Sequence, residues 1–258
     1  DTMMAVYEIT FSPTGGTDKV TELLTEAMDG EKRRISLLPE KEDYSRHVFK
    51  SGDICFIAVP SFGGRVPQEA AKRLGMMKGN QARAVLVCVY GNRAYEDTLA
   101  ELKDILEDKG FVTVSAAALV AEHSIMHIYG TGRPDGCDEI SIKKFADDLL
   151  EKLKTMKSPV SIDVPGNRPY KPYGVIHLAP ETGKECVKCG ICANECPVKA
   201  IPFDNPSITE KEKCISCGNC KRVCPMEVDV TDNSRKRENG TECILCMECV
   251  KACPKKAL

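Results

Sequence analysis

Cysteine is concentrated at the carboxyl-terminal end of this 258-residue chain. Of its 15 cysteines, 12 fall in three copies of one pattern, C-x2-C-x2-C-x3-C-P. Thiolates two residues apart can each reach a different iron of a cubane, and the intervening amides can donate hydrogen bonds to the sulfurs. The spacing therefore predicts [4Fe–4S] clusters. The predicted ligands are Cys186, Cys189, Cys192 and Cys196; Cys214, Cys217, Cys220 and Cys224; and Cys243, Cys246, Cys249 and Cys253.

Zinc sites and disulfides are the other common uses of so many cysteines. Zinc favours paired C-x2-C ligands, often with histidine, and needs only four ligands per site. Disulfides need an oxidising compartment. The sequence shows no secretory segment near its start, so we expect a reducing, cytoplasmic setting. The three remaining cysteines, Cys55, Cys88 and Cys137, are predicted to be structural.

The number of clusters is left open by the spacing. In two-cluster modules the fourth cysteine of one motif ligates the cluster of the other. Cys196 would then join the second motif, and Cys224 would join the first. The third motif would then close on itself or exchange with another partner. The second and third motifs make an equally regular pair, because 18 residues separate Cys224 from Cys243. We favour three clusters, and two clusters with four unused cysteines are the alternative.

Charge and hydropathy exclude several classes of partner. The net charge of −2 gives no electrostatic case for binding nucleic acid or an acidic membrane surface. No apolar run approaches the roughly 20 residues that span a bilayer. The oligomeric state is not indicated by the sequence.

Composition divides the chain into three parts. Residues 1–157 alternate apolar runs with amphipathic stretches, which is typical of an ordinary α/β domain. Residues 158–185 are rich in proline and glycine, so we predict a linker or a strap laid over a surface. Residues 186–258 hold the cysteine motifs and are predicted to form a small α+β iron–sulfur domain.

The first part reads as strands alternating with helices. Strands are predicted at 4–11, 33–38, 54–60, 82–90 and 112–120, and helices at 18–28, 67–77, 95–108 and 140–153. Such an alternation predicts an α/β fold with a doubly wound, five-stranded parallel sheet. Ligands of such sheets bind beyond the carboxyl ends of the strands. The loops at those ends are therefore the candidate binding site.

The loop after the first strand reads S-P-T-G-G-T and leads into a helix. Hydroxyls and backbone amides before a helix N-terminus form a phosphate cradle, and glycine lets the backbone approach the anion. No lysine follows in the position that a nucleoside-triphosphate loop requires. A helix-capping turn without a ligand is the alternative. The candidate residues are Ser12, Pro13, Thr14, Gly15, Gly16 and Thr17.

Two further loops at the same edge combine glycine with aromatic residues. A flavin ring is flat and largely apolar, so it can stack on aromatic side chains while backbone amides bond its polar edge. Phe62 and Tyr90 are the first stacking candidates, and Tyr95 is the third. The candidate residues are Pro60, Ser61, Phe62, Gly63 and Gly64 after the third strand, and Tyr90, Gly91, Asn92 and Tyr95 after the fourth.

Together these motifs resemble the flavodoxin–ferredoxin fusion proteins of anaerobic bacteria. Residues 4–157 are similar to a flavodoxin, and S-P-T-G-G-T matches the S/T-x-T-G-x-T phosphate loop of that family. The resemblance implies a flavodoxin-like domain that binds FMN, with the phosphate on Ser12, Thr14, Gly15, Gly16 and Thr17, followed by a ferredoxin-like module. The chain departs from the pattern in having no tryptophan, and in having three cysteine motifs where such fusions commonly have two.

This architecture implies electron transfer between FMN and [4Fe–4S] clusters, in exchange with redox partner proteins. The alternative is an FMN-dependent reductase of a small acceptor, such as a quinone or nitro compound. A reductase needs a proton donor near the flavin, for which Arg65, Tyr90, His123 and His127 are the candidates. The glycines of Y-G-T-G-R-P-D-G do not form a dinucleotide fingerprint. We therefore expect that NADH or NADPH alone does not reduce the protein.

Overall fold

The computed structural model describes residues 5–124, 128–173, 179–181, 186–223 and 229–231. The chain divides into two compact units, residues 1–174 and 175–258, which are taken in turn. Of the helices in these described ranges, none combines the length and the apolar character needed to cross a bilayer.

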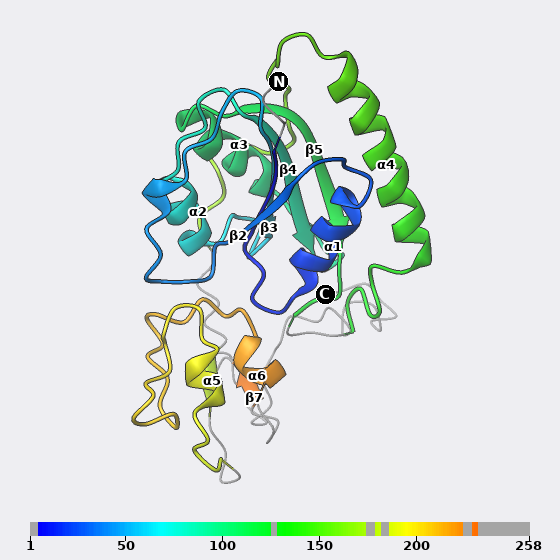
Figure 1. The fold of residues 1–258 in the computed structure, drawn as a ribbon. Coiled ribbons are helices and arrows are strands. Elements are labelled where there is room, and N and C mark those ends of the chain that lie inside the picture. Colours follow the sequence, from blue (N-terminus) through cyan, green and yellow to red (C-terminus); the bar gives the residue numbers. More distant parts are fainter. Residues whose placement is uncertain (1–4, 125–127, 174–178, 182–185, 224–228, 232–258) are drawn as a thin grey trace. The chain divides into compact units, whose positions relative to one another are not determined.

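The first unit is built on a five-stranded parallel sheet (Figure 1). Its strands lie side by side in the order β2-β1-β3-β4-β5. This is the flavodoxin-like order, in which the switch point lies between β1 and β3. The predicted doubly wound α/β fold is therefore confirmed. The strands are β1 (Val6–Thr10), β2 (Lys32–Ser36), β3 (Ile54–Pro60), β4 (Arg83–Tyr90) and β5 (Val112–Val120).

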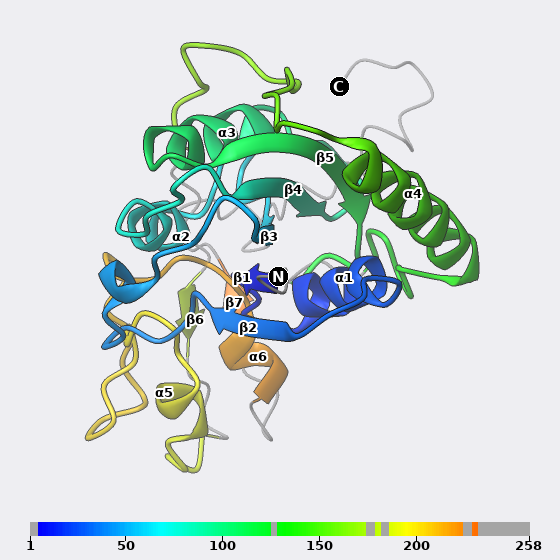
Figure 2. The ribbon, with the colours of Figure 1, turned by 45° about the horizontal axis from the view of Figure 1, so that its top comes forward.

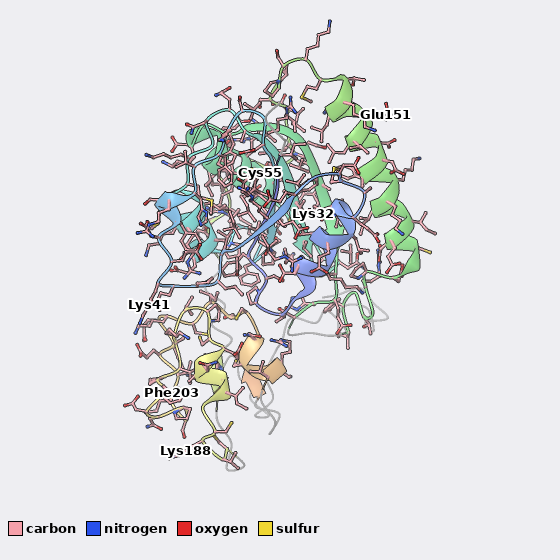
Figure 3. The ribbon with its side chains drawn as sticks, viewed as in Figure 1. Lys32, Lys41, Cys55, Glu151, Lys188 and Phe203 are labelled. Atoms are coloured by element: carbon pink, nitrogen blue, oxygen red, sulfur yellow. The ribbon has the colours of Figure 1, made fainter. Side chains whose placement is uncertain are left out.

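The two central strands carry continuous apolar sequence because helices cover both faces of the sheet there. Every residue from Ile54 to Val59 is buried, and so is every residue from Ala84 to Val89. Cys55 and Cys88 lie within these runs and are fully buried (Figure 3 labels Cys55). Burial raises the pKa of Cys88 to about 12, so its thiol stays protonated and behaves as a small apolar group.

Helices α1 (Gly16–Thr25) and α4 (Gly136–Thr155) cover one face of the sheet, and α2 (Gln68–Leu74) and α3 (Thr98–Asp108) cover the other (Figures 1 and 2). A single turn of 3-10 helix, η1 (Tyr44–Arg46), lies between β2 and β3. Leu24 of α1 and Ile142 of α4 belong to one apolar cluster with the central strands.

Two helices begin three or more residues away from the start that the hydrophobic pattern predicts. Helix α4 starts four residues before the predicted Ile140, at Gly136, because Asp135 caps it and forms a reciprocal capping box with Asp138. Helix α3 starts three residues after the predicted Tyr95. Glu96 has a backbone φ of +42°, which no helix accommodates, so the preceding residues remain in the loop.

The proline-rich segment 158–173 lies in the first unit and follows α3 in the antiparallel direction. Near the C-terminal end of α3, the Ser161 hydroxyl bonds Glu107 at 2.6 Å. Near the N-terminal end, the Asn167 amide N–H bonds the Asp97 carboxylate at 2.7 Å. We call residues 158–173 the strap.

The described residues of the second unit form two short helices and one antiparallel strand pair. The helices are α5 (Ile191–Asn194) and α6 (Asn219–Val223), and β6 (Ala179–Glu181) pairs with β7 (Asp229–Thr231). Asn219 is buried and donates from its amide to the Glu195 carbonyl at 2.7 Å, which joins the start of α6 to the end of α5.

Candidate cofactor sites

The parallel sheet brings the predicted loops to one edge. Strands β1, β3 and β4 are neighbours and run in the same direction, so residues 11–17, 60–67 and 90–97 all follow carboxyl ends. This edge contains the switch point, where open α/β sheets bind their ligands. The loop after β5 begins at this edge too and contacts two of these loops. A Cβ on Gly16 would lie 3.7 Å from the Ala121 Cβ, and the His123 ring packs closely against Gly91.

The S-P-T-G-G-T loop has the backbone of an anion cradle. Gly15 occupies the N-cap position of α1 with φ of +88°, and no side chain caps the helix there. Among the described residues, none accepts a hydrogen bond from the amides of Gly16 or Thr17. A Cβ on Gly15 would meet no heavy atom within 4 Å, so this position faces open space. Free amides at a helix N-terminus suit a phosphate.

Ser12 lies in the buried part of the loop and holds the loop to the start of α1. Its side chain is buried, and its hydroxyl accepts from the Asp18 amide at 3.0 Å. Asp18 in turn accepts from the Thr10 hydroxyl at 2.6 Å. This chain of bonds fixes the loop to β1. Pro13 and Thr17 are buried with Ser12, whereas Thr14 and Gly16 are half-buried and Gly15 is exposed.

The loop after β3 is a tight turn. The backbones of Phe62 and Arg65 bond each other in both directions, at 3.0 and 3.2 Å. Gly63 and Gly64 form the turn with φ of +61° and +84°, a region that glycine adopts without strain. A Cβ on Gly63 would meet open space, whereas one on Gly64 would collide with the Glu96 carboxylate. Pro60, Ser61 and Phe62 are half-buried at its start.

The loop after β4 places two of the three aromatic candidates together. The rings of Tyr90 and Tyr95 make an edge-to-face pair with centroids 5.3 Å apart. Asn92 is exposed and has φ of +61°, which asparagine tolerates better than most residues. A Cβ on Gly91 would lie 2.6 Å from the His123 ring, so this glycine is needed for the close approach. His127 lies outside the described residues.

The two aromatic loops are bonded to each other. The Asp97 amide donates to the Gly64 carbonyl at 3.0 Å, and the hydroxyls of Ser61 and Thr98 lie 2.8 Å apart. The Ser61 hydroxyl is therefore bonded within the protein, and the contact of Ser61 with a cofactor stays a prediction. The residues present fit a flavin mononucleotide: amides and glycine at the helix N-terminus for the phosphate, and glycine with half-buried aromatic rings for the ring system.

The first two cysteine motifs share one backbone conformation. Lys188 and Ser216, each one residue before the second cysteine of its motif, have φ of +54° and +53°. Gly190 and Gly218, each following that cysteine, have φ of +77° and +78°. The cysteine between each such pair does not have positive φ, and backbone that alternates in handedness in this way turns its amides inward and favours a negatively charged group. The sequence repeat is thus also a structural repeat (Figure 3 labels Lys188).

Cys196 of the first motif lies within electrostatic range of the cysteines of the second motif. Burial, with a smaller contribution from the negative charges of neighbouring cysteines that include Cys196 and Cys214, raises the pKa of Cys217 and of Cys220 to about 12. The Cys196 sulfur also accepts from the Ala200 amide at 3.3 Å. Ligation deprotonates such thiols, so cluster assembly releases protons. Cys224 and the third motif, Cys243, Cys246, Cys249 and Cys253, lie outside the described residues.

Within the described ranges, no three His, Cys, Asp or Glu side chains lie close enough to ligate one metal ion. A cubane takes one thiolate on each of its four irons, so its ligands stand farther apart than the ligands of a single ion.

Comparison with known proteins assigns the second part of the chain. Residues 185–228 match a family model of the 4Fe-4S dicluster domain, and residues 213–258 match a second model of the same description. The second motif belongs to both matches. Together with the strand order of the first unit, these matches define a chain that joins a flavodoxin-like domain to 4Fe–4S dicluster segments.

Solved structures similar to this chain include two flavodoxins. Flavodoxin 1 from Bacillus cereus is 12% identical over 57% of this chain and 97% of that protein, with a TM-score of 0.41. The flavodoxin of Streptococcus pneumoniae TIGR4 is 17% identical over 57% and 99%, with a TM-score of 0.43. An NADH:FMN oxidoreductase is 15% identical over 61% and 95%, with a TM-score of 0.44. A search of curated proteins finds no match. The fold assignment rests on the strand order.

Proposed function

We propose that this protein transfers electrons between FMN, bound at the carboxyl edge of the sheet, and [4Fe–4S] clusters bound by the cysteine motifs. The observation that carries the proposal is the pairing of two kinds of site in one chain. Free amides and Gly15 form an anion cradle at the switch point, and Cys196 lies within electrostatic range of Cys214, Cys217 and Cys220.

FMN exchanges one or two electrons and each cluster exchanges one, so the two groups together can convert between single electrons and pairs. The residues of the chain supply position and shielding. The amides of Gly16 and Thr17 hold the phosphate, with the α1 dipole favouring its charge. Phe62, Tyr90 and Tyr95 cover the ring system. The inward-turned amides of the cysteine motifs stabilise the negative clusters.

Three clusters are the proposed complement, because all three motifs have the complete spacing. Anaerobic purification followed by iron and flavin analysis tests this proposal. About twelve irons per FMN are expected for three cubanes. About eight would mean that one motif holds no cluster. Absence of FMN from protein that retains iron, even after incubation with FMN, would overturn the flavin assignment.

The electron donor is proposed to be another protein rather than a nicotinamide nucleotide. Gly136 begins α4, but the Asp135 carboxylate already accepts from the amides of Cys137 and Asp138 at 2.9 and 3.1 Å. This helix N-terminus therefore has its own anion. Anaerobic bleaching of the flavin by NADH or NADPH alone would contradict the proposal.

Turnover separates a carrier from a reductase. A carrier needs only an exposed flavin edge, whereas a reductase also needs a pocket and a proton donor. Quinones and nitro compounds should be reduced no faster by the reduced protein than by an equal concentration of reduced free FMN. A rate well above that of free FMN would favour the reductase, and His123, which lies against Gly91, would then be the first proton donor to test.

A further inference from the structure

The strap ends on the two aromatic loops of the proposed flavin site. It begins near the amino end of β5, where the Ile162 amide bonds the Thr113 carbonyl at 3.0 Å. It then follows α3 toward its N-terminus. Tyr173, at its far end, bonds the Val66 carbonyl at 3.0 Å in the loop after β3. The strap therefore crosses from the amino edge of the sheet to the carboxyl edge, where the candidate loops lie.

Asp97 connects the strap to both loops. Its side chain accepts from the Asn167 amide and the Lys171 amide, each at 2.7 Å, and from the Asn167 side chain at 3.0 Å. Its own amide donates to the Gly64 carbonyl. Asp97 is only 1% exposed. The Lys171 amide, followed by that of Asn167, lowers the pKa of this carboxyl, so it is ionised at neutral pH.

Arg65 makes the second connection. Its guanidinium forms a two-pronged ion pair with Glu101 at 2.7 and 2.8 Å, and donates to the Lys171 carbonyl. The rings of Tyr170 and Tyr173 flank it, with centroids 4.8 and 4.1 Å from the guanidinium carbon. Arg65 belongs to the loop after β3, and both tyrosines belong to the strap.

Glu101 completes the network from α3. Besides Arg65, it accepts from the Val66 amide and from the Tyr173 hydroxyl, each at 2.9 Å. Buried charges are tolerated only when they are paired and fully hydrogen-bonded. Forming only some of these bonds is therefore unfavourable in free energy, so the network favours a single conformation of both loops.

Glycine permits the close seat of the strap on α3. Gly166 has φ of +135°, and a Cβ there would lie 2.5 Å from the Ala100 Cβ. On the other side of the contact, the Lys171 ammonium pairs with Glu96, whose carboxylate lies against Gly64. The strap thus contacts both loops through main chain and side chain.

We propose that the strap is a clamp for the flavin-binding loops, in which Arg65, Asp97 and Glu101 act as positioning residues for FMN. The inference rests on the proposed function, because it assigns FMN to these loops. Binding to preorganised loops avoids the entropy of ordering them, so loosening the clamp lowers affinity without removing a cofactor contact. This also accounts for the buried charges of Arg65, Asp97 and Glu101, which contact the end of a segment whose composition is typical of a linker.

Two variants loosen the clamp, and one matched variant alters the strap elsewhere. Asp97→Asn replaces an acceptor of three bonds, and Tyr173→Phe removes two hydrogen bonds while keeping the ring over Arg65. Arg168→Ala is the control. It removes an ion pair with Asp104 at 2.6 Å and a hydrogen bond to the Ala100 carbonyl at 3.3 Å, and neither contact involves Arg65, Asp97 or Glu101.

The measurements are the Kd of FMN for flavin-depleted full-length protein, the visible circular dichroism of the bound flavin, and hydrogen exchange of residues 61–67 and 90–97. We expect Asp97→Asn to weaken FMN binding about tenfold and Tyr173→Phe about threefold, with Arg168→Ala within about twofold. Both clamp variants should alter the flavin dichroism and speed exchange in the two loops, with iron content unchanged.

Equal FMN affinity and equal loop exchange in wild type and both clamp variants would overturn the clamp. So would a loss in Arg168→Ala as large as in Asp97→Asn. Failure of the wild type to bind FMN would overturn the flavin assignment and the positioning role together. Unchanged FMN binding in the clamp variants, beside normal binding in the wild type, would overturn the clamp alone.

Discussion

Replacing Glu101 with glutamine should destabilise the flavodoxin-like unit more than any exposed charge replacement. The side chains of Arg65 and Glu101 are 11% and 7% exposed, so neither charge has solvent as an alternative partner. The variant leaves Arg65 without its counter-charge and turns an amide N–H₂ toward groups that donate hydrogen bonds. Removing one partner of a buried pair costs about 3–5 kcal/mol. That is a large share of the roughly 5–15 kcal/mol that stabilises a typical domain.

Hydrogen exchange of the β3 and β4 amides measures this loss, because these central strands open only with the whole unit. The free energy of opening should fall by about 3–5 kcal/mol in Glu101→Gln. Glu31→Gln is the matched control. Its partner is Arg33, the two side chains are 61% and 51% exposed, and the expected loss is much smaller than in Glu101→Gln because solvent screens the pair.

The double variant Arg65→Met with Glu101→Leu should regain part of the stability, because it leaves no unpaired buried charge, although the Val66 amide loses its acceptor. A loss in Glu101→Gln no larger than in Glu31→Gln would refute the reasoning. It would mean that water or rearranged neighbours satisfy Arg65, and that the pair does not hold the loop.

Three further predictions concern single residues. Gly15→Val should abolish FMN binding but leave the iron content unchanged, because a β-branched residue at φ of +88° is strained and covers the cradle amides. Flavin and iron analysis of the purified variant checks this prediction, and loss of both cofactors would contradict it. Cys196→Ser should lower the iron by about four per chain, by loss of the cluster held with the second motif; unchanged iron would contradict that assignment. Burial and the bond to Asp104 raise the pKa of Tyr170 to about 12. The folding stability that Tyr170 contributes is thus complete below the usual tyrosine pKa of about 10 and is lost as pH rises from there to about 12. In a pH titration of tyrosinate absorbance, Tyr170→Phe should lack one group that ionises near pH 12 in the wild type. Loss of a group that ionises near pH 10 instead would show that Tyr170 is solvated.

Much of the fold of the first unit could be predicted from the sequence, because strands that are buried on both faces have a recognisable apolar pattern. The apolar runs of β3 and β4 occur only in strands covered on both faces. Helix ends were harder to predict, because local bonds and not periodicity set them. The capping box of Asp135 extends α4, and the positive φ of Glu96 delays α3.

The candidate loops were predictable as a set, because parallel strands bring their carboxyl ends to one edge. Contacts within that set were not. The bond of the Ser61 hydroxyl to Thr98, and the closure of His123 on Gly91, join residues more than 30 positions apart. The strap gave only a compositional signal, since proline and glycine indicate irregular backbone but not the surface that receives it. The acidic residues that face it, Asp97 just before α3 and Glu101 within α3, carry no pattern that would predict their partners.

Electron transfer within one chain is the central claim, and its most direct test is rapid reduction of the clusters by a one-electron donor under anaerobic conditions. Flavin absorbance and cluster paramagnetism are followed together at two protein concentrations. Our account predicts that the clusters are reoxidised as the flavin is reduced, at a rate independent of protein concentration. Flavin that stays oxidised beside reduced clusters, or a rate proportional to concentration, would contradict it.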